Sequence, residues 1–539
     1  MAGSARFDAE YDFVVVGAGS AGCVLANRLS ARSDVNVLLL EAGPADRNPW
    51  IHIPIGYYRT MVNPRISWGY DTETVESAGN RTFDWPRGKV VGGCSSVNGL
   101  VYARGQSEDF DHWRSLGNTG WGFGDVLPYF MRAEGATIND IDEGFHGRDG
   151  PLTISRASRH PLCDAYIQAA TQAGIPANSD YNGRVQEGAG YFQVTTRNGL
   201  RSSAATAYLN PARKRQNLHI QTNSLVRRLV IENRRVVGVD VDQGGKHQLI
   251  RARREVLLCA GTINSPQILQ LSGIGDSELL KSTGITPCHH LPEVGENLQD
   301  HYTCSSKYRC SQPVTVNDEV ATWVGKVRIA LRWLKDRGGP MSLSAGQVGV
   351  FAKTHADCET PDVQFHFMRY SAQKRGRDLD PFPGFTVTMC QLRPESRGYV
   401  RIKSSDHRDK PLIQPNYLTT DKDCETMVAG LRLVRKVASQ PALGSYISEE
   451  MRPGAGVTDD AALLDYVRNN GSTIFHPSST CRMGVDEGAV VDPRLKVNGI
   501  EGLRVADASV MPTLVSANTN AACIMIGEKA ADMVLQDHA

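Results

Sequence analysis

The start of the chain contains a complete strand–helix–strand unit with a glycine-rich turn. An apolar run, 11–16, ends at Gly17, and the pattern G-x-G-x-x-G continues through Gly19 and Gly22. A helix-like segment and a second apolar run, 35–40, follow. The first glycine permits the tight turn, the second lets backbone approach a pyrophosphate, and the third lets the helix pack closely on the strand. Because free N–H groups and a partial positive charge lie at the start of such a helix, this unit predicts a site for an ADP-containing cofactor.

An acidic residue ends the second predicted strand of this unit. Glu41 lies about twenty residues beyond the last glycine, where a carboxylate can accept hydrogen bonds from ribose hydroxyls. Strand, helix, strand and acid are all in register, which favours a nucleotide site over the alternative, a glycine turn in an unrelated α/β protein. The unit alone does not separate NAD from FAD.

The composition is that of a globular protein with little net charge. The chain has 539 residues, 41% of them hydrophobic and 22% charged, and a net charge of +1. The length predicts two or more domains, and the balanced charge gives no reason to expect a nucleic acid as partner. No apolar run reaches the roughly eighteen residues that a membrane span needs, and residues 1–10 lack the apolar core of a signal peptide.

The twelve cysteines are scattered along the chain without a C-x-x-C pair. Such spacing is typical of buried thiols in a reducing compartment, so neither a disulfide framework nor a metal site is expected. We expect the protein in the cytoplasm, and attachment to the surface of the inner membrane is left open.

Later segments extend the cofactor fold and interrupt it. The runs 225–231 and 236–241 predict a hairpin, and 254–261 predicts a buried strand followed by a helix through Leu271. A strand over 503–507 and a helix over 521–535 are expected near the end of the chain. The cofactor fold is therefore assembled from separated segments.

The middle of the chain, 303–472, has different sequence patterns from the segments of the cofactor fold and predicts an inserted second domain. It contains an amphipathic helix around 324–334 and a strand-like alternation at 363–367. The predicted boundaries are 8–156, 203–303 and 473–539 for the cofactor-binding domain, and 157–202 and 304–472 for the second domain.

Two further glycine clusters carry chemistry. In 86–98, Gly92 and Gly93 stand beside small hydroxyl residues, so backbone can lie against a flat or anionic ligand; a flexible surface loop is the alternative. In 261–275, Pro266 follows a plausible cap and is expected to open a helix that ends at Gly273. Taken locally, the second cluster is a well-capped helix.

In this order the segments 88–98 and 261–275 resemble the two signature segments of the glucose-methanol-choline (GMC) family of FAD-dependent oxidoreductases, and 297–301 stands between the core and the inserted domain. The resemblance covers essentially the whole chain and is strongest to bacterial choline-dehydrogenase-like alcohol dehydrogenases, through 51–56, 104–106 and 117–121. It implies an α/β fold: a Rossmann-like FAD-binding domain of discontinuous segments, plus an inserted substrate-binding domain with an antiparallel sheet and helices.

The resemblance also implies which residues contact FAD. Asp507 and Ala508 match positions at the ribityl-phosphate region, and Val226 matches a position whose backbone reads adenine. The helix that begins near Asn520 is expected to point its positive end toward the pyrimidine side of the flavin. The full set of expected cofactor contacts is Gly17, Gly19, Ser20, Ala21, Gly22, Glu41, Ala42, Trp68, Arg87, Val91, Gly93, Ser96, Asn98, Gly99, Val101, Val226, Ala260, Asp507, Ala508 and Thr519.

The chain departs from the family pattern at two places. Family members that tether FAD through a histidine carry it immediately before Asn98; here that residue is Val97, so FAD is expected to be bound non-covalently. Choline-oxidising members place a glutamate near the position of Gln347. A neutral amide loses the attraction for a quaternary ammonium group, which makes choline an unexpected substrate, although Glu319 could serve instead.

The implied reaction is oxidation of an alcohol by hydride transfer to flavin N5. His476 lies in a segment resembling the family's H-P-x-x-T-x-x-M-G, which implies the general base, and Asn518 falls on the second catalytic position. Capping of the following helix is the structural alternative for Asn518, and both roles can hold together. A GMC-fold lyase, a photodecarboxylase, a choline dehydrogenase and an oxygen-using alcohol oxidase remain as alternative functions.

The substrate is expected to be a neutral primary alcohol, aliphatic, polyether or aromatic. Phe365, Phe367, Met368 and Trp68 are plausible apolar lining of its pocket, and ordinary core is the alternative for each. A quinone or dye-type electron acceptor is favoured over O₂, and a monomer or homodimer is expected.

Overall fold

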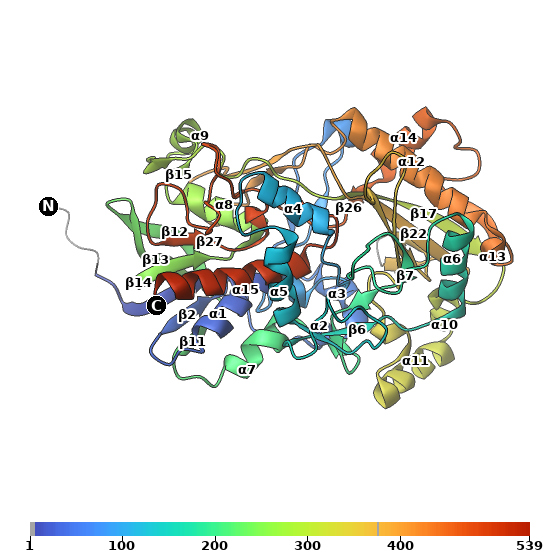
Figure 1. Cartoon of the computed structure of the whole chain (residues 1–539), viewed down its shortest axis with the longest axis horizontal. Coiled ribbons are helices and arrows are strands. Elements are labelled where there is room, and N and C mark those ends of the chain that lie inside the picture. Colours follow the sequence, from blue (N-terminus) through green and yellow to red (C-terminus); the bar gives the residue numbers. More distant parts are fainter. Residues whose placement is uncertain (1–5, 375–376) are drawn as a thin grey trace.

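The computed structural model describes residues 6–374 and 377–539 and contains two large sheets at opposite ends of the molecule (Figure 1). The first sheet has the strand order β11–β2–β1–β14–β13–β12, and β27 also pairs with β14. Its strands are β1 (Ala9–Val16), β2 (Val37–Leu40), β11 (Leu218–Gln221), β12 (Leu225–Glu232), β13 (Arg235–Gln243), β14 (Lys246–Leu258) and β27 (Leu503–Val505).

The centre of the first sheet is parallel and fully buried. Strands β1, β2, β11 and β27 run parallel to their neighbours, and residues 13–16 and 37–40 are buried on both faces. Continuous runs of valine and leucine suit such strands because helices cover the sheet. The antiparallel hairpin β12–β13 joins the sheet because β13 pairs with the first half of β14. The predicted hairpin and strands are confirmed.

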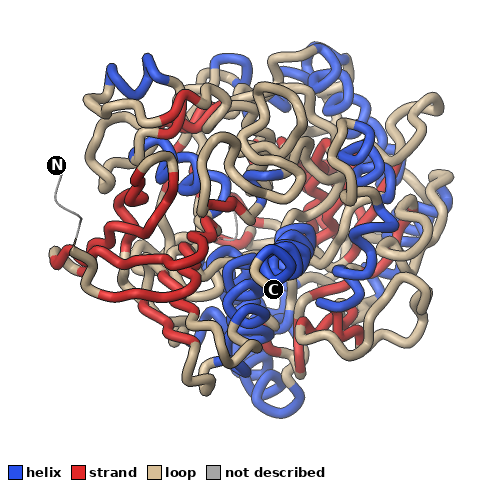
Figure 2. The backbone as a smooth tube through the Cα atoms, turned by 60° about the vertical axis from the view of Figure 1, so that its left-hand side comes forward, coloured by secondary structure: helices blue, strands red, loops and turns tan. Residues whose placement is uncertain are grey.

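Helices α1 (Ser20–Leu29) and α15 (Asn520–Asp537) pack together beside this sheet; Figure 2 places the C-terminus at the near end of α15. Glycines set how closely these elements approach. A Cβ atom on Gly22 would lie 1.9 Å from the carbonyl oxygen of Gly17, so only glycine lets α1 start this near the strand. A Cβ on Gly527 of α15 would lie 3.0 Å from Ala21 of α1.

The second sheet is antiparallel throughout, in the order β25–β17–β22–β19–β18–β7, with β26 paired to β17. Helices α6, α12 and α14 cover one face over an apolar core that includes Phe365 and Phe367. Its strands are β7 (Gly188–Tyr191), β17 (Tyr302–Cys310), β18 (Val348–Ala352), β19 (Val363–Met368), β22 (Gly384–Gln391), β25 (Ile447–Arg452) and β26 (Ser472–Thr473).

The remaining α-helices of four or more residues are connecting or covering elements. They are α2 (Pro49–His52), α3 (Tyr57–Thr60), α4 (Ser107–Ser115), α5 (Phe123–Ala133), α6 (Pro161–Gln172), α8 (Gly261–Leu271), α9 (Ser277–Ser282), α10 (Val316–Ala321), α11 (Trp323–Asp336), α12 (Asp421–Ala438), α13 (Pro441–Gly444) and α14 (Asp460–Asn470). None of the helices in the described part of the chain combines the length and apolar character that a membrane span needs.

The predicted combination of a nucleotide-binding α/β fold and an inserted antiparallel sheet with helices is confirmed. Strands of the two sheets alternate along the chain, which agrees with a discontinuous first domain, while the residue boundaries of the two domains stay a prediction. The expected helices at 324–334 and 521–535 are present as α11 and α15.

The start of helix α8 differs from the expectation. The helix begins at Gly261, so Pro266 lies inside it rather than opening it. A proline inside a helix leaves the carbonyl four residues earlier without its usual N–H donor. Here that carbonyl, of Thr262, accepts a hydrogen bond from the Thr480 hydroxyl at 2.6 Å, which explains how the helix continues through the proline.

Candidate active site

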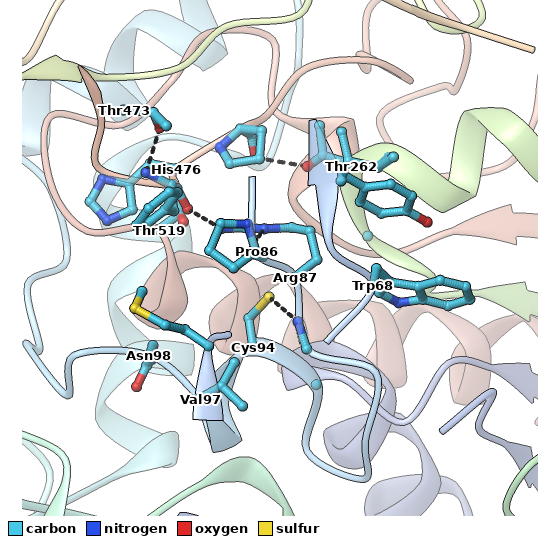
Figure 3. Close-up of a pocket in the computed structure, with 18 of the residues that line it drawn as sticks. Trp68, Pro86, Arg87, Cys94, Val97, Asn98, Thr262, Thr473, His476 and Thr519 are labelled. Atoms are coloured by element: carbon cyan, nitrogen blue, oxygen red, sulfur yellow. Dashed lines mark hydrogen bonds between the residues drawn. The ribbon is translucent and has the colours of Figure 1, made fainter. Parts of the chain in front are cut away.

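A cavity of about 660 Å³ lies between the two sheets. Its wall includes the glycine turn at one end, and His476 and Asn518 at the other. Figure 3 shows Arg87 between His476 and Trp68, with Val97 and Asn98 on a neighbouring segment. The cavity therefore joins segments from both ends of the chain.

The nucleotide end of the cavity is formed by two helix starts. Gly17 has a φ of 101°, in the region that favours glycine, and Gly19 precedes α1 without a side-chain cap. The Ser20 hydroxyl donates to the side-chain oxygen of Asn520, 2.8 Å away, so α1 and α15 begin side by side. Unused N–H groups and the positive ends of both helix dipoles favour an anionic ligand here.

Glu41 is buried at the end of β2. Its two carboxylate oxygens accept hydrogen bonds from the backbone N–H groups of Ala18 at 3.0 Å and Gly43 at 2.8 Å. Burial raises the pKa of Glu41, and the two backbone bonds oppose that shift. Each oxygen keeps a further lone pair, so the carboxylate can still accept from ribose hydroxyls.

The second glycine loop lies directly against the first. A Cβ atom on Gly93 would lie 2.7 Å from Cα of Gly19, so the two loops touch through glycines. Ser96 and Val91 lie behind the cavity surface, and the Ser96 hydroxyl donates to the Val91 carbonyl at 2.8 Å. These two residues therefore hold the loop in shape.

Asp507 ties the end of β27 to the start of α8. One of its oxygens accepts from the Gly261 N–H at 2.8 Å and from the Ser265 hydroxyl at 2.6 Å, and the other accepts from the Ser509 N–H. Ser265 is thus a partner of Asp507 rather than a helix cap.

Most of the predicted cofactor contacts line the cavity. Those in its wall are Gly17, Gly19, Ser20, Ala21, Glu41, Ala42, Trp68, Arg87, Gly93, Asn98, Gly99, Val101, Val226, Ala260, Asp507, Ala508 and Thr519. Gly22, Val91 and Ser96 lie outside the wall: Gly22 allows the close approach of helix and strand, and the other two brace the glycine loop.

At the other end, His476 belongs to a chain of hydrogen bonds that sets its protonation. His301 Nε2 lies 3.2 Å from the carbonyl oxygen of Leu392, so this nitrogen must donate. Neutral His301 then accepts at Nδ1, which lies 3.0 Å from His476 Nδ1. His476 therefore carries its proton on Nδ1, and its unprotonated Nε2, on the cavity side, is a hydrogen-bond acceptor.

Asn518 donates a hydrogen bond to that nitrogen. Its Nδ2 is 3.1 Å from His476 Nε2, and its Oδ1 accepts from the Gln364 amide at 3.3 Å, which fixes the orientation of the Asn518 amide. The residue before α15 is Thr519, and no side chain caps the helix, so the capping alternative for Asn518 is wrong.

The surroundings keep His476 uncharged. Burial, followed by neighbouring His301, His366 and Arg87, holds the pKa of His476 well below its usual range. The backbone N–H of His476 donates to the Asp300 carboxylate at 2.7 Å, and Arg87 donates to the carbonyl of Phe475 at 2.8 Å. The loop is thus held on both sides of the imidazole.

Sequence reasoning missed Asp300, His301, Gln364 and His366 as site residues. Asp300 and His301 lie in the segment 297–301, which served only as a family marker. Gln364 and His366 alternate with the two phenylalanines of β19, so a period of two offered both faces as candidates. The pattern could not say which face the helices cover.

The predicted substrate residues on β19 are corrected. Phe365 and Phe367 are fully buried under the helices, where Phe367 stacks on Tyr166 with ring centroids 4.3 Å apart. Because strand side chains alternate, His366 and Met368 line the cavity instead. Core, the alternative interpretation, is right for both phenylalanines.

The predicted roles of Gln347 and Glu319 are corrected as well. Gln347 lies outside the cavity wall, donates to the Ser344 carbonyl at 3.2 Å and accepts from the Arg369 N–H at 3.1 Å. Its amide is therefore occupied by backbone. Glu319 also lies outside the wall and forms an ion pair with Arg369.

The cavity face of the second sheet is more polar than expected. Hydroxyl side chains project into the cavity there, from Thr303 and Ser305 on β17 and from Thr386 and Thr388 on β22. Lys307 follows on β17, and Tyr58, Tyr370 and Met368 supply the apolar part. Among the described residues, no carboxylate lines the part of the cavity walled by this sheet.

Comparison with known proteins relates nearly the whole chain to one family. Residues 11–303 and 394–527 match the GMC oxidoreductase family. The chain is 41% identical to an oxygen-dependent choline dehydrogenase of Vibrio vulnificus (strain YJ016) over 97% of this chain and 94% of the relative. It is 40% identical to an alcohol dehydrogenase [acceptor] of Pseudomonas putida, covering 98% and 96% of the two chains.

The fold is shared with a solved structure over nearly its full length. Pyridoxine 4-oxidase from Mesorbium loti superimposes with a TM-score of 0.89 at 30% identity, over 98% of this chain and 99% of the other. The two-sheet architecture and the cavity between the sheets agree with this relationship. The chain is a member of the GMC oxidoreductase family, enzymes that act on CH–OH groups with FAD as cofactor.

Proposed function

We propose that the protein oxidises a neutral primary alcohol to the aldehyde, with non-covalently bound FAD and with His476 as general base. The observation that carries the proposal is the chain from Leu392 through His301 to His476, which leaves Nε2 of His476 unprotonated on the cavity side. The same cavity begins at the glycine turn that suits a pyrophosphate.

The residues present fit FAD. Gly17, Gly19 and the start of α1 would hold the pyrophosphate, Glu41 the ribose, and Asp507 with Ala508 the ribityl-phosphate region. A Cβ on Gly19 would meet only one atom within 4 Å, at 3.9 Å, so its backbone is open to a ligand. When bound, FAD supplies the acceptor for the hydride.

Val97 supports non-covalent binding because its side chain has no nucleophile, and it lines the cavity. Denaturation in acid followed by ultrafiltration tests this directly. All of the flavin absorbance is expected in the filtrate; flavin retained with the protein would contradict it.

His476 and Asn518 divide the chemistry at the substrate hydroxyl. The substrate hydroxyl would replace the hydrogen bond between Asn518 Nδ2 and His476 Nε2. Nε2 of His476 then accepts the hydroxyl proton, and Nδ2 of Asn518 donates a hydrogen bond to the oxygen that becomes negative as the proton leaves. Because the pKa of His476 is lowered, the imidazole is neutral and ready to accept at pH 7. The hydrogen bond from Gln364 to Oδ1 of Asn518 keeps Nδ2 of Asn518 directed toward His476.

The charge of the cavity favours a neutral substrate over choline. A quaternary ammonium group leaves water at a high cost unless a carboxylate faces it. The second-sheet wall carries hydroxyls and Lys307 but no carboxylate among the described residues, and Glu319 is already paired with Arg369. A neutral alcohol meets no such cost.

The acceptor is proposed from the resemblance to the family, and the location from the scattered cysteines, which are typical of a reducing compartment. The Pseudomonas relative is named an alcohol dehydrogenase [acceptor] and the Vibrio relative an oxygen-dependent choline dehydrogenase, so the relatives name both kinds of acceptor. We propose the quinone or dye-type acceptor, as the sequence resemblance implies. We propose a monomer or homodimer that works in the cytoplasm and attaches to the membrane surface.

A panel of alcohols, each assayed with a dye and with O₂, tests the proposal. Neutral primary alcohols are expected to turn over, faster with the dye. The His476→Ala variant is expected to keep its FAD absorbance while turnover drops by about 10²–10⁴-fold. Normal turnover in that FAD-loaded variant would refute the base, and no turnover of any alcohol by the wild type would favour a lyase.

A further inference from the structure

Helix α11 presents an apolar stripe to solvent. Of the ten large apolar residues that are exposed in the described chain, five lie on this one helix. Trp323 is 77% exposed, Leu331 61% and Leu334 69%, and Val324 and Val327 complete the set. Scattered single apolar residues are ordinary on a protein surface, but a contiguous stripe marks a contact with something else.

The stripe is fixed in its outward position. Residues 323, 327, 331 and 334 are spaced by four, four and three, so they share one face of the helix. The opposite side holds Trp333, which is buried, and Ile329, which is half-buried. Thr322 caps the first turn through the Gly325 N–H, 3.0 Å away. The apolar face therefore cannot turn inward without losing the buried Trp333.

Cations border the stripe on both sides. At 100° per residue, Lys326 lies on one side, while Arg328 and Lys335 lie on the other, with Arg332 beyond them. In the described part of the chain, none of these four side chains forms an ion pair. The helix is thus apolar in the middle and positively charged along its borders.

The nearby acidic residues are already engaged. Asp336 accepts from the Gly338 N–H at 2.8 Å, Asp318 is bonded to Thr315, and Glu319 is paired with Arg369. Lys326, Arg328, Arg332 and Lys335 give α11 four positive charges against the single negative charge of Asp336, an excess of three. A partner for this face must combine apolar groups with negative charge.

We infer that α11 is a docking helix that lies in the interface of an anionic membrane, with its apolar stripe among the acyl chains and its lysines and arginines at the headgroups. An apolar face bordered by Lys and Arg, with Trp on the apolar side, is the arrangement that interfacial helices use. A second copy of this chain fits less well, because pairing two α11 stripes brings like charges together.

Helix α11 is connected through α10 to residues of the cavity wall, which relates membrane docking to access to the cavity. Helix α10, joined to α11, places Val316 and Val320 in a small core with Tyr58, Met368 and Tyr370. Those last three residues also line the cavity. A membrane seated on α11 would lie near this wall, so apolar alcohols and a quinone-type acceptor would be concentrated near it. Figure 1 shows α11 at the edge of the molecule, away from α1 and α15.

The inference rests on the peripheral location proposed above, and not on the chemistry at His476. Co-sedimentation of the FAD-loaded full chain with vesicles tests it, using phosphatidylcholine alone and an equal mixture with phosphatidylglycerol. Binding is expected to the anionic vesicles and to weaken in high salt, because exposed charges are screened. Absence of binding to anionic vesicles would overturn the inference.

Two variants and two matched controls localise the surface. Leu331→Ser with Leu334→Ser, and Lys326→Glu with Lys335→Glu, are each expected to weaken vesicle binding by at least about tenfold. The first control, Val185→Ser with Val485→Ser, replaces two exposed apolar residues outside α11. The second control, Lys422→Glu with Lys436→Glu, makes the same charge change on α12. Neither control is expected to alter binding.

Turnover of a water-soluble alcohol with a soluble dye is expected to be unchanged in all four, which shows that they fold. Equal losses in the controls would overturn the inference. So would a dimer in solution that Leu331→Ser with Leu334→Ser abolishes. Vesicle binding without alcohol turnover would contradict the proposed function and leave the docking of α11 supported.

Discussion

Replacing His301 tests how the protein prepares its base. His301 is fully buried and touches the base rather than the cavity wall, so it acts as a positioning residue. In His301→Leu, the Nδ1–H of His476 loses its acceptor. In His301→Asn, the amide oxygen can occupy the place of Nδ1 and keep that bond. Both variants lose the bond to the Leu392 carbonyl, so the pair differs mainly in the acceptor.

The expected magnitude follows from the burial of the pair. Leaving a buried donor without a partner costs about 1–3 kcal/mol. His476 escapes that cost by moving its proton to Nε2, where it can no longer accept the substrate proton. At about 1.4 kcal/mol for each factor of ten, kcat/KM is expected to fall about 5- to 150-fold in His301→Leu. In His301→Asn the fall is expected to be much smaller.

The assay is kcat/KM with a soluble dye across pH, with FAD content and Tm measured in parallel. A third variant, His301→Asp, places a carboxylate beside His476, which favours its charged form and should move the acid limb of the pH profile upward. Both neutral variants should lose similar thermal stability, because both lose the Leu392 bond. Equal falls in kcat/KM for leucine and asparagine, with an unmoved profile for aspartate, would refute the reasoning.

Three further predictions follow from the site. Because the pKa of His476 is lowered well below its usual range, kcat/KM should stay level as pH falls through 6.5 and decline only at lower pH; a midpoint above 6.5 would contradict this. Burial lowers the pKa of His301 to about 4 and of His366 to about 3, so below pH 6.5 the unfolded chain takes up protons that the folded protein excludes. Above pH 6.5 these two groups should leave the free energy of unfolding constant. At pH 5 each of them should lower it by about 2 kcal/mol, which urea titrations can measure. Gly93→Ala should weaken FAD binding by at least about tenfold in ultrafiltration, because its Cβ would lie 2.7 Å from the glycine turn, whereas Gly69→Ala, at a similar φ but with open space, should keep its FAD.

The sequence was most informative where one short segment contains all of a feature's requirements. The unit from 11 to 41 holds its strand, turn, helix and acid within one local pattern, and the structure builds it as predicted. The hairpin at 225–243 and helix α15 are similarly local. Their patterning depends on which residues are apolar and at what spacing, which can be read directly.

Features that depend on distant partners could not be read this way. The alternation in β19 is clear, but its inward face is decided by helices α6 and α12, so the sequence predicted the phenylalanines as lining and missed His366. Pro266 is tolerated inside α8 only because Thr480, far along the chain, satisfies the freed carbonyl. His301 gains its role from contact with a residue 175 positions away.

The most direct test of the central claim compares two alcohols of nearly identical shape. Choline and 3,3-dimethylbutan-1-ol differ only in a charged nitrogen or a neutral carbon at the branch point. With no carboxylate on the second-sheet wall of the cavity among the described residues, kcat/KM is expected to be at least about tenfold higher for the neutral alcohol, and His476→Gln should reduce both. A clear preference for choline would contradict the account.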